Sequence, residues 1–118
     1  MDQDVEFSVI IPTRNRINLI ERCLRSIQEN DVKGVEILII NDGSDKRTTE
    51  YLKTLDKGNI RIFNTEHIGQ SSARNIGLRN AKGRFFLFTD DDCIVPKDWI
   101  KDITAAFRNI RQMQWVAR

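Results

Sequence analysis

The sequence predicts an α/β protein with a doubly wound, mostly parallel sheet and helices on both faces. Two observations support this fold class. Apolar runs of strand length alternate four times with segments whose apolar residues recur at helical spacing. Three of the apolar runs also pass directly into polar loops that carry carboxylates. Because right-handed crossovers join parallel strands, the alternation is expected to gather these loops at one edge of the sheet.

Four apolar runs are predicted as the strands. The first covers residues 7–12 and ends at Pro12, because proline has no N–H to donate to a sheet ladder. Residues 35–40 form the second, and the shorter, alternating run 60–63 is expected at an edge of the sheet. The fourth, residues 85–88, holds four apolar residues in succession, which predicts a strand buried on both faces.

The segments between these runs are predicted as helices. Asn18, with Glu21 three residues later, resembles a capping box at the start of the first helix. Ser44 or Asp45 is expected to cap the second helix, which Gly58 ends. Both helices carry apolar residues at helical spacing, which predicts that each packs one side against the sheet.

A third helix is predicted within residues 69–83, and a fourth is expected to open at Pro96. Ala73 and Gly77 would let the third helix approach the sheet closely, although Gly77 costs about 1 kcal/mol of helix propensity against alanine. Gly83 is expected to end that helix, and a further strand is predicted to begin at residues 114–117. The apolar side of the fourth helix is predicted to consist of Trp99, Ile100, Ile103, Phe107 and Ile110.

The composition is that of a globular chain with balanced charge. Its 118 residues suffice for one domain that buries about two-thirds of its unfolded surface. Nineteen basic and seventeen acidic residues leave a net charge of +2, which argues against nucleic acid or an anionic membrane as partner. No apolar stretch approaches the length of about 18 residues that a membrane span requires, and the N-terminus does not resemble a signal peptide. Cys23 and Cys93 have neither metal nor redox spacing, so reduced thiols in a cytoplasmic protein are expected.

Three consecutive carboxylates, Asp90, Asp91 and Asp92, follow the fourth apolar run directly. Two unit charges about 4 Å apart repel by roughly 4 kcal/mol at an effective dielectric constant of about 20. Such a cluster must be well solvated, partly protonated or facing a cation, and its hard oxygen ligands favour Mg²⁺ or Mn²⁺. Ligands of open α/β sheets lie outside the carboxyl ends of the strands. The triplet therefore predicts a metal-assisted site for a phosphorylated ligand, with a solvated acidic turn as the alternative.

Four polar segments follow one another at the ends of the predicted elements. They are Pro-Thr-Arg-Asn at 12–15, Asn-Asp-Gly-Ser at 41–44, Gly-Gln-Ser-Ser-Ala-Arg-Asn-Ile-Gly at 69–77 and Asp-Asp-Asp at 90–92. Each is weak alone, but the set in this order resembles the nucleotide-binding half of family 2 glycosyltransferases, from about residue 7 to residue 107. Members of this family are inverting, metal-dependent enzymes with the GT-A fold, in which the first four strands lie in the order 3-2-1-4.

The resemblance implies a nucleotide-binding role for the first two segments. Pro12, Thr13 and Arg14 would line the base pocket of a nucleoside diphosphate sugar. Asp42 would pair with the base, which is usually uracil, because a carboxylate can accept from an imide N–H. Gly43 would let the backbone turn away from the base. The implied ligand is therefore a nucleoside diphosphate sugar, most simply a UDP-sugar.

The resemblance also implies roles for the last two segments. Arg74 would contact the nucleotide near the base or the diphosphate. Asp90 and Asp92 are the ends of an Asp-x-Asp motif, in which Asp90 lies nearer the ribose and Asp92 coordinates the Mn²⁺ or Mg²⁺ that bridges the diphosphate. Asp91 would point away or add to the negative field. The metal would neutralise the charge that builds on the leaving nucleoside diphosphate.

Simpler interpretations stand beside these roles. Asp42 could cap the following helix, Arg74 could be a solvated or ion-paired side chain, and His67 could be a surface loop residue. A haloacid-dehalogenase-like, Mg²⁺-dependent phosphotransferase also ends a strand in Asp-x-Asp, but its nucleophilic aspartate normally lies on the first strand, and no acid occurs at 12–15. A non-catalytic nucleotide-binding or assembly module is the other alternative. The chain lacks both a Gly-x-Gly-x-x-Gly segment after the first strand and a P-loop.

Family members continue beyond this length, and their second half builds the acceptor site and supplies the general base. No candidate base follows Asp102, so we expect residues 1–118 to be a single donor-binding domain that binds without transferring sugar. The acceptor, a glycan or a lipid, is not indicated. The apolar strand 85–88 and residues 114–117 predict a homodimer through the exposed sheet edge, with coverage of that edge by residues 114–117 of the same chain as the alternative. A cytoplasmic location is expected, extending to the inner membrane face in a full-length protein.

Overall fold

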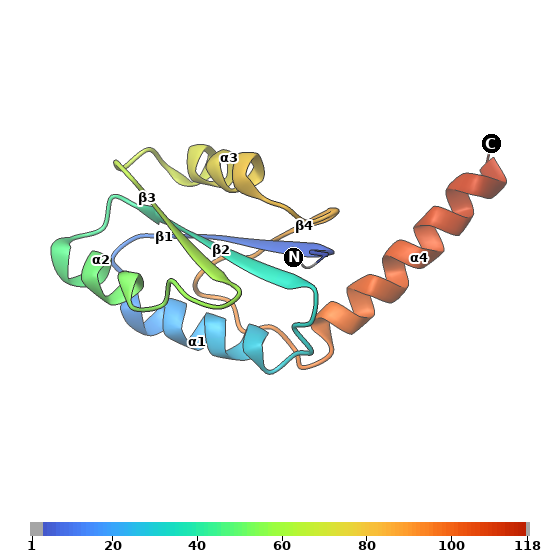
Figure 1. The fold of residues 1–118 in the computed structure, drawn as a ribbon, viewed down its shortest axis with the longest axis horizontal. Helices are drawn as coiled ribbons and strands as arrows, with labels where there is room; N and C mark the ends of the chain where they lie inside the picture. Colours follow the sequence, from blue (N-terminus) through green and yellow to red (C-terminus); the bar gives the residue numbers. More distant parts are fainter. Residues whose placement is uncertain (1–3, 118) are drawn as a thin grey trace.

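Strand and helix alternate along the chain in a computed structural model that describes residues 4–117, and the side chains of residues 4–109 (Figure 1). The four pairs of elements follow the predicted order. They are β1 (Phe7–Thr13), α1 (Ile17–Gln28), β2 (Val35–Asp42), α2 (Lys46–Lys53), β3 (Ile60–Thr65), α3 (Gln70–Asn80), β4 (Phe85–Phe88) and α4 (Trp99–Ala117).

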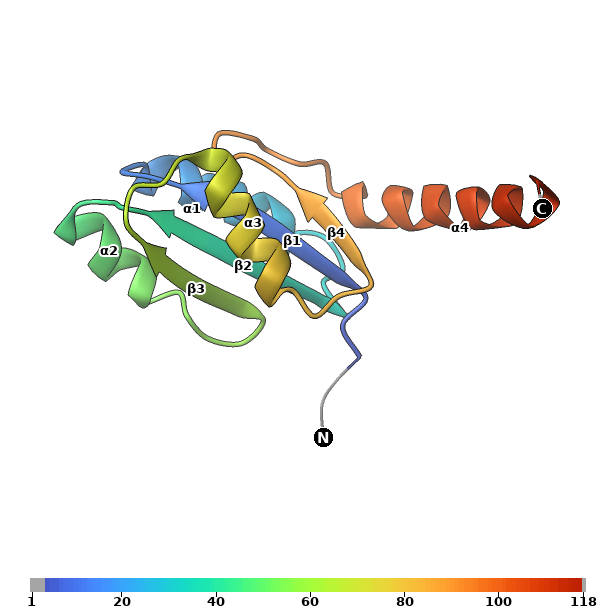
Figure 2. The same ribbon diagram turned by 90° about the horizontal axis from the view of Figure 1, so that it is seen from above.

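The four strands form one parallel sheet in the order β3-β2-β1-β4, which confirms the predicted fold class and strand order. In register, Phe7 of β1 lies opposite Val35 of β2 and Phe85 of β4. Helices α1 and α2 cover one face of the sheet and α3 covers the other (Figures 1 and 2). Every residue of β1 and β2 is buried, as expected for central strands covered on both sides.

Alternate residues of the central strands supply two separate hydrophobic layers. On one side Val9 and Ile37 pack in the cluster that holds Ile20 of α1, and the start of α4 joins the same cluster through Ile100. On the other side Ile10 packs with Leu38, Ile40 and Ala73 beneath α3. Because strand side chains alternate between faces, a continuous apolar run provides both layers.

Helix α3 lies very close to the sheet at Gly77. A Cβ atom added at Gly77 would lie 2.5 Å from Cγ2 of Ile10, so only glycine fits at this distance. The predicted close approach of this helix is therefore confirmed. The helix itself ends at Asn80, before Gly83. Gly83 has another role, because a Cβ there would lie 2.6 Å from Oγ of Ser8 on β1.

Strand β4 is only half buried, so the prediction of a strand buried on both faces was wrong. Leu87 is buried, whereas Phe86 and Phe88 are 43% and 46% exposed. These two residues lie opposite Ser8 and Ile10 in register, on the face that α3 covers. Helix α3 packs on β1 and β2, so it leaves this face of the edge strand uncovered (Figure 2).

Two predicted helix starts differ from the structure. Helix α1 begins at Ile17, with Arg16 at the cap position, so Asn18 lies inside the helix and forms no capping box. The start is set earlier because Asn15 has a positive φ of 56°, which turns the chain directly after β1. Helix α4 begins at Trp99 rather than at Pro96. Asp45 does cap α2, since its side chain accepts a hydrogen bond from the Thr48 N–H.

The predicted strand at residues 114–117 was also wrong, because α4 continues through this segment to Ala117. Glutamine and alanine at the two ends of this segment are compatible with a helix that has already begun, and in the described sheet the segment pairs with no strand. The side chain of Ile110, predicted on the apolar side of this helix, lies outside the described residues. Within the described part of the chain, no helix combines the length and the apolar character that crossing a membrane requires.

Candidate functional site

The carboxyl ends of the strands surround a pocket of about 220 Å³. Segments far apart in the sequence line it: the end of β1 and its loop, the end of β2, and the loop between β3 and α3. Its lining consists of Pro12, Thr13, Arg14, Arg16, Asp42, His67, Gly69, Gln70 and Asp91. Five of the eight predicted site residues thus share one pocket, whereas Arg74, Asp90 and Asp92 lie outside its lining.

Asp42 is held by the loop between β3 and α3. Its Oδ1 accepts from the Ile68 N–H at 2.6 Å, its Oδ2 accepts from the Gly69 N–H at 3.1 Å, and Nδ1 of His67 lies 3.2 Å from Oδ2. The carboxylate is therefore bound at the entrance to α3 and does not cap the helix that follows β2. Gly43 has a φ of 67°, and a Cβ there would lie 2.5 Å from the His67 nitrogen. Glycine is required here so that the two loops can meet.

Asp91 is the buried member of the acidic triplet. Its Oδ2 accepts from Oγ1 of Thr13 at 2.8 Å, and its Oδ1 accepts from Nη1 of Arg16 at 3.3 Å. These contacts connect the end of β4 to the end of β1, so Asp91 fixes two walls of the pocket relative to each other. Arg16 was not among the residues predicted for the site, although a cation four residues after Pro12 is a signal for a site at this end of the sheet.

Arg74 of α3 reaches the end of β4, where Nη2 lies 2.9 Å from Oδ1 of Asp90. Both side chains are partly exposed. The ion pair places the guanidinium of Arg74 beside the acidic triplet, which follows β4. The arrangement brings together two residues that the sequence predicted for one site.

Asp90, Asp92 and Cys93 form a group that could hold a metal ion. One potential ligand atom from each of the three lies within 4.8 Å of the other two, and all three residues are exposed. Two carboxylates are suitable ligands for Mg²⁺ or Mn²⁺, whereas a thiol is a softer ligand. Cys93 was missed by the sequence reasoning, which considered only its distance from Cys23, although it follows the triplet directly.

Cys23 lies beneath the same loop, and its thiol is 3.5 Å from the carbonyl oxygen of Asp90. Burial raises the pKa of Cys23 to about 12, with further contributions from Cys93 and from the triplet carboxylates. The side chain therefore remains a thiol near neutral pH and packs as part of the core.

The loops after β1 and β2 hold each other in place beside the pocket. The Asn15 N–H donates to Oγ of Ser44 at 3.0 Å, and Oδ1 of Asn15 accepts from the Asp45 N–H at 2.7 Å.

A larger hollow of about 550 Å³ lies at the amino-terminal ends of the strands, around Glu36 and Arg61. Ligands of parallel sheets bind at the carboxyl ends of the strands, so the smaller pocket is the candidate site.

Comparison with known proteins agrees with this geometry. The family model described as "Glycosyl transferase family 2" matches residues 8–114, which is most of the chain. The chain belongs to glycosyltransferase family 2. It is 34% identical over 102 residues to the glycosyltransferase GlyA of Streptococcus pneumoniae, a match that covers 85% of this chain and 15% of GlyA. The 118 residues thus span a small part of such relatives.

Two solved structures of GT-A glycosyltransferases share the fold. Residues 1-349 of TarS of Staphylococcus aureus, in complex with UDP, give a TM-score of 0.73 and 30% identity, and the match covers 86% of this chain and 31% of that TarS chain. The mannosyltransferase PcManGT of Pyrobaculum calidifontis, in complex with GDP-Man and Mn²⁺, has a TM-score of 0.67 and 27% identity. The match covers 81% of this chain and 30% of the PcManGT chain. Relatives of this fold therefore bind nucleotides with different bases, and one binds a divalent metal.

Proposed function

We propose that these residues form the donor-binding part of an inverting, metal-dependent glycosyltransferase that uses a UDP-sugar. The observation that carries the proposal is the position of the pocket, which joins Asp42 to the ends of β1 and β4. Family membership supplies the class of reaction. The TarS complex with UDP supports uridine as the nucleoside.

The donor set beside the pocket fits a hard divalent cation. Asp90 and Asp92 both offer carboxylate oxygens, and the neighbouring Arg74 is held by Asp90 rather than by Asp92. A cation bound there would neutralise the charge that develops on the leaving nucleoside diphosphate. Mn²⁺ in the PcManGT complex supports Mn²⁺ or Mg²⁺ for this chain.

The residues of the chain itself would bind and orient the nucleotide. Arg14 and Arg16 bring positive charge to the pocket wall, which favours an anionic ligand. Asp42 offers a fixed carboxylate that can accept from a base N–H. In an inverting transfer the acceptor oxygen attacks the anomeric carbon from the face opposite the diphosphate. The carbon–oxygen bond to the diphosphate breaks, and the acceptor proton passes to a base.

Titration of UDP with Mn²⁺ and with a chelator tests the proposal. We expect wild-type protein to bind UDP at least about tenfold more tightly with Mn²⁺, a difference of about 1.4 kcal/mol. Asp92→Asn should remove this difference and leave the fold intact. The matched control is Asp98→Asn, an exposed carboxylate outside the acidic group. Equal affinity of the wild-type protein with Mn²⁺ and with chelator would contradict the proposed metal dependence.

A further inference from the structure

The contacts of Asp42 determine which nucleobase it can accept. Its side chain is 6% exposed and lines the pocket, so a ligand can reach it over a small area only. Oδ1 receives one backbone N–H, from Ile68. Oδ2 receives the Gly69 N–H and also has Nδ1 of His67 at 3.2 Å.

A carboxylate has about four acceptor positions, two on each oxygen. The Ile68 N–H takes one position on Oδ1, and the Gly69 N–H takes one on Oδ2. Nδ1 of His67 lies 3.2 Å from Oδ2, close enough to take the second position there, and this leaves a base the remaining position on Oδ1. Without His67, one position would be open on each oxygen.

Uracil and guanine differ in how many donors they present to such a group. The imide of uracil has a single in-plane N–H, flanked by two carbonyl oxygens. Guanine presents a ring N–H and an amino group side by side, and this pair of donors matches both oxygens of one carboxylate. Structures similar to this chain include complexes with UDP and with GDP-Man, so the fold accommodates either base.

His67 is held where it can exclude the second donor. Its backbone lies directly against Gly43, where an added Cβ would approach the His67 nitrogen to 2.5 Å. The imidazole is 59% exposed and forms part of the pocket wall. The imidazole therefore lies beside Oδ2 of Asp42 at the pocket wall, on a loop that packs against the end of β2.

We propose that His67 is a specificity-determining residue that limits Asp42 to one hydrogen bond with a nucleobase and thereby selects uracil over guanine. The inference rests on the proposed binding of a nucleoside diphosphate in this pocket. It assigns the choice between uracil and guanine to His67, in the loop between β3 and α3. His67 acts through Asp42, so it is a positioning residue rather than a catalytic one.

The test is calorimetric titration of UDP and GDP, each with Mn²⁺, into wild-type protein and three variants. Both ligands carry the same diphosphate, so the ratio of their affinities isolates the base. Wild-type protein is expected to prefer UDP, and His67→Ala is expected to reduce that preference about three- to tenfold, the range of one net hydrogen bond. His67→Asn, whose amide can again cover Oδ2, should restore the preference. Glu66→Ala, an exposed neighbour on the same loop that does not line the pocket, should leave it unchanged.

The outcomes separate the inference from the proposed function. If wild-type protein binds UDP but His67→Ala keeps the wild-type ratio or weakens both nucleotides equally, the selection by His67 is wrong and donor binding stands. A wild-type preference for GDP would also overturn the selection. If wild-type protein binds neither nucleotide, the proposed function itself fails. Circular dichroism and thermal unfolding of each variant establish that a changed ratio comes from folded protein.

Discussion

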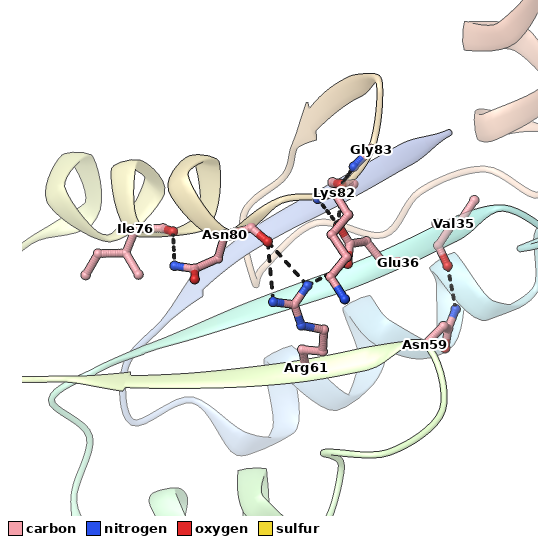
Figure 3. Close-up of polar contacts among 9 residues, drawn as sticks. Val35, Glu36, Asn59, Arg61, Ile76, Asn80, Lys82 and Gly83 are labelled. Carbon is pink, nitrogen blue, oxygen red and sulfur yellow. Dashed lines mark hydrogen bonds and ion pairs between the residues drawn. The ribbon is translucent and has the colours of Figure 1, made fainter. Parts of the chain in front are cut away.

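The carboxylate of Glu36 is buried near the amino-terminal ends of the strands, opposite the candidate functional site. It accepts from Oγ of Ser8 at 2.6 Å, from the Lys82 N–H at 2.6 Å and from Nη1 of Arg61 at 2.8 Å. Figure 3 shows this group, in which Arg61 also donates to the carbonyl oxygen of Asn80. One carboxylate therefore joins β1, β2 and β3 to the turn before β4. A buried charge is tolerated there because both of its oxygens accept hydrogen bonds and Arg61 supplies an opposite charge.

Replacing Glu36 tests this stabilisation. Burial by itself would raise the pKa of Glu36, but the hydrogen bonds from Ser8, Lys82 and Arg61 outweigh it and lower the pKa below its usual value. We predict that Glu36→Gln lowers the free energy of unfolding at pH 7 by about 1.5–3 kcal/mol, the range for hydrogen bonds to a charged group. Urea denaturation measures the change. Glu50→Gln, at an exposed position, serves as the matched control.

The difference in unfolding free energy between wild type and Glu36→Gln should also depend on pH, and it should be smaller in acid. A carboxylate whose pKa is lower in the folded state stabilises the protein above its unfolded pKa, about 4.3 for glutamate. The stabilisation is lost as the pH falls through the lower, folded value. The difference between wild type and Glu36→Gln should therefore be full at pH 7 and shrink below about pH 4. A difference that stays constant down to pH 3 would contradict the assigned contribution.

The two cysteines are predicted to react very differently with a thiol reagent. Cys93 is exposed, whereas Cys23 is buried with its pKa raised to about 12, so little Cys23 thiolate is present near neutral pH. At pH 8, Ellman's reagent should modify one thiol quickly, and the second only when the protein unfolds. Cys93→Ser should remove the fast phase and Cys23→Ser should retain it. Two equally fast thiols in native protein would show that Cys23 is accessible.

At the scale of elements, the packing of α3 on the sheet depends on small residues. Ala73 and Gly77 are both buried, one turn apart, and face β1 and β2. The same helix carries Arg74 toward Asp90, and its cap residue Gly69 donates its N–H to Asp42. The distance of α3 from the sheet therefore also sets the position of two groups of the candidate site.

The variant Gly77→Ala tests whether close packing or helix propensity dominates the stability of α3. Alanine gains about 1 kcal/mol in propensity, but its Cβ would meet Ile10, and overpacking of this kind costs about 1–3 kcal/mol. We predict a net loss of stability, seen as a lower melting temperature. Asn75→Ala, at an exposed position of the same helix, should gain stability instead. A stabilised Gly77→Ala variant would mean that Ile10 moves aside without cost.

At the scale of the whole molecule, the described sheet has two edges with different character. β3 at one edge has mixed residues, and Arg61 lies over the ring of Phe63, 5.0 Å from its centroid. β4 at the other edge pairs with β1 alone and exposes Phe86 and Phe88. Helix α4 points away from the body of the domain beyond this edge (Figures 1 and 2). An exposed apolar edge strand is a template for pairing with another chain.

We predict that two copies of these 118 residues associate through β4. The helical state of residues 114–117 excludes the strand pairing first expected for that segment, so the edge itself would carry the contact. Sedimentation velocity should show association in the micromolar range, and Phe86→Lys with Phe88→Lys should abolish it. Ile94→Lys changes an exposed apolar residue outside β4 and is the matched control. A wild-type protein that stays monomeric at high concentration would contradict the prediction.

The sequence by itself was sufficient to determine the class and order of the elements. Apolar runs at 7–12, 35–40 and 85–88 and the helical periodicity between them are local properties, and the chirality of the crossovers leaves few topologies open. The positions of polar residues at strand ends also indicated one edge as the site. The acidic triplet could be selected in this way, whereas the roles expected of Asp42 and Arg74 came from the resemblance to family 2 glycosyltransferases.

Only the tertiary structure decided what each of these residues contacts. Period and composition cannot tell which member of three adjacent aspartates turns inward, and it is Asp91, bound to Thr13 from 78 positions away. Nor could they show that Asp42 is held by Ile68, Gly69 and His67. The four apolar residues of β4 suggested full burial, yet α3 leaves part of that strand open. Each of these features depends on how distant segments approach one another, which is set by packing between elements and not by the local pattern that forms them.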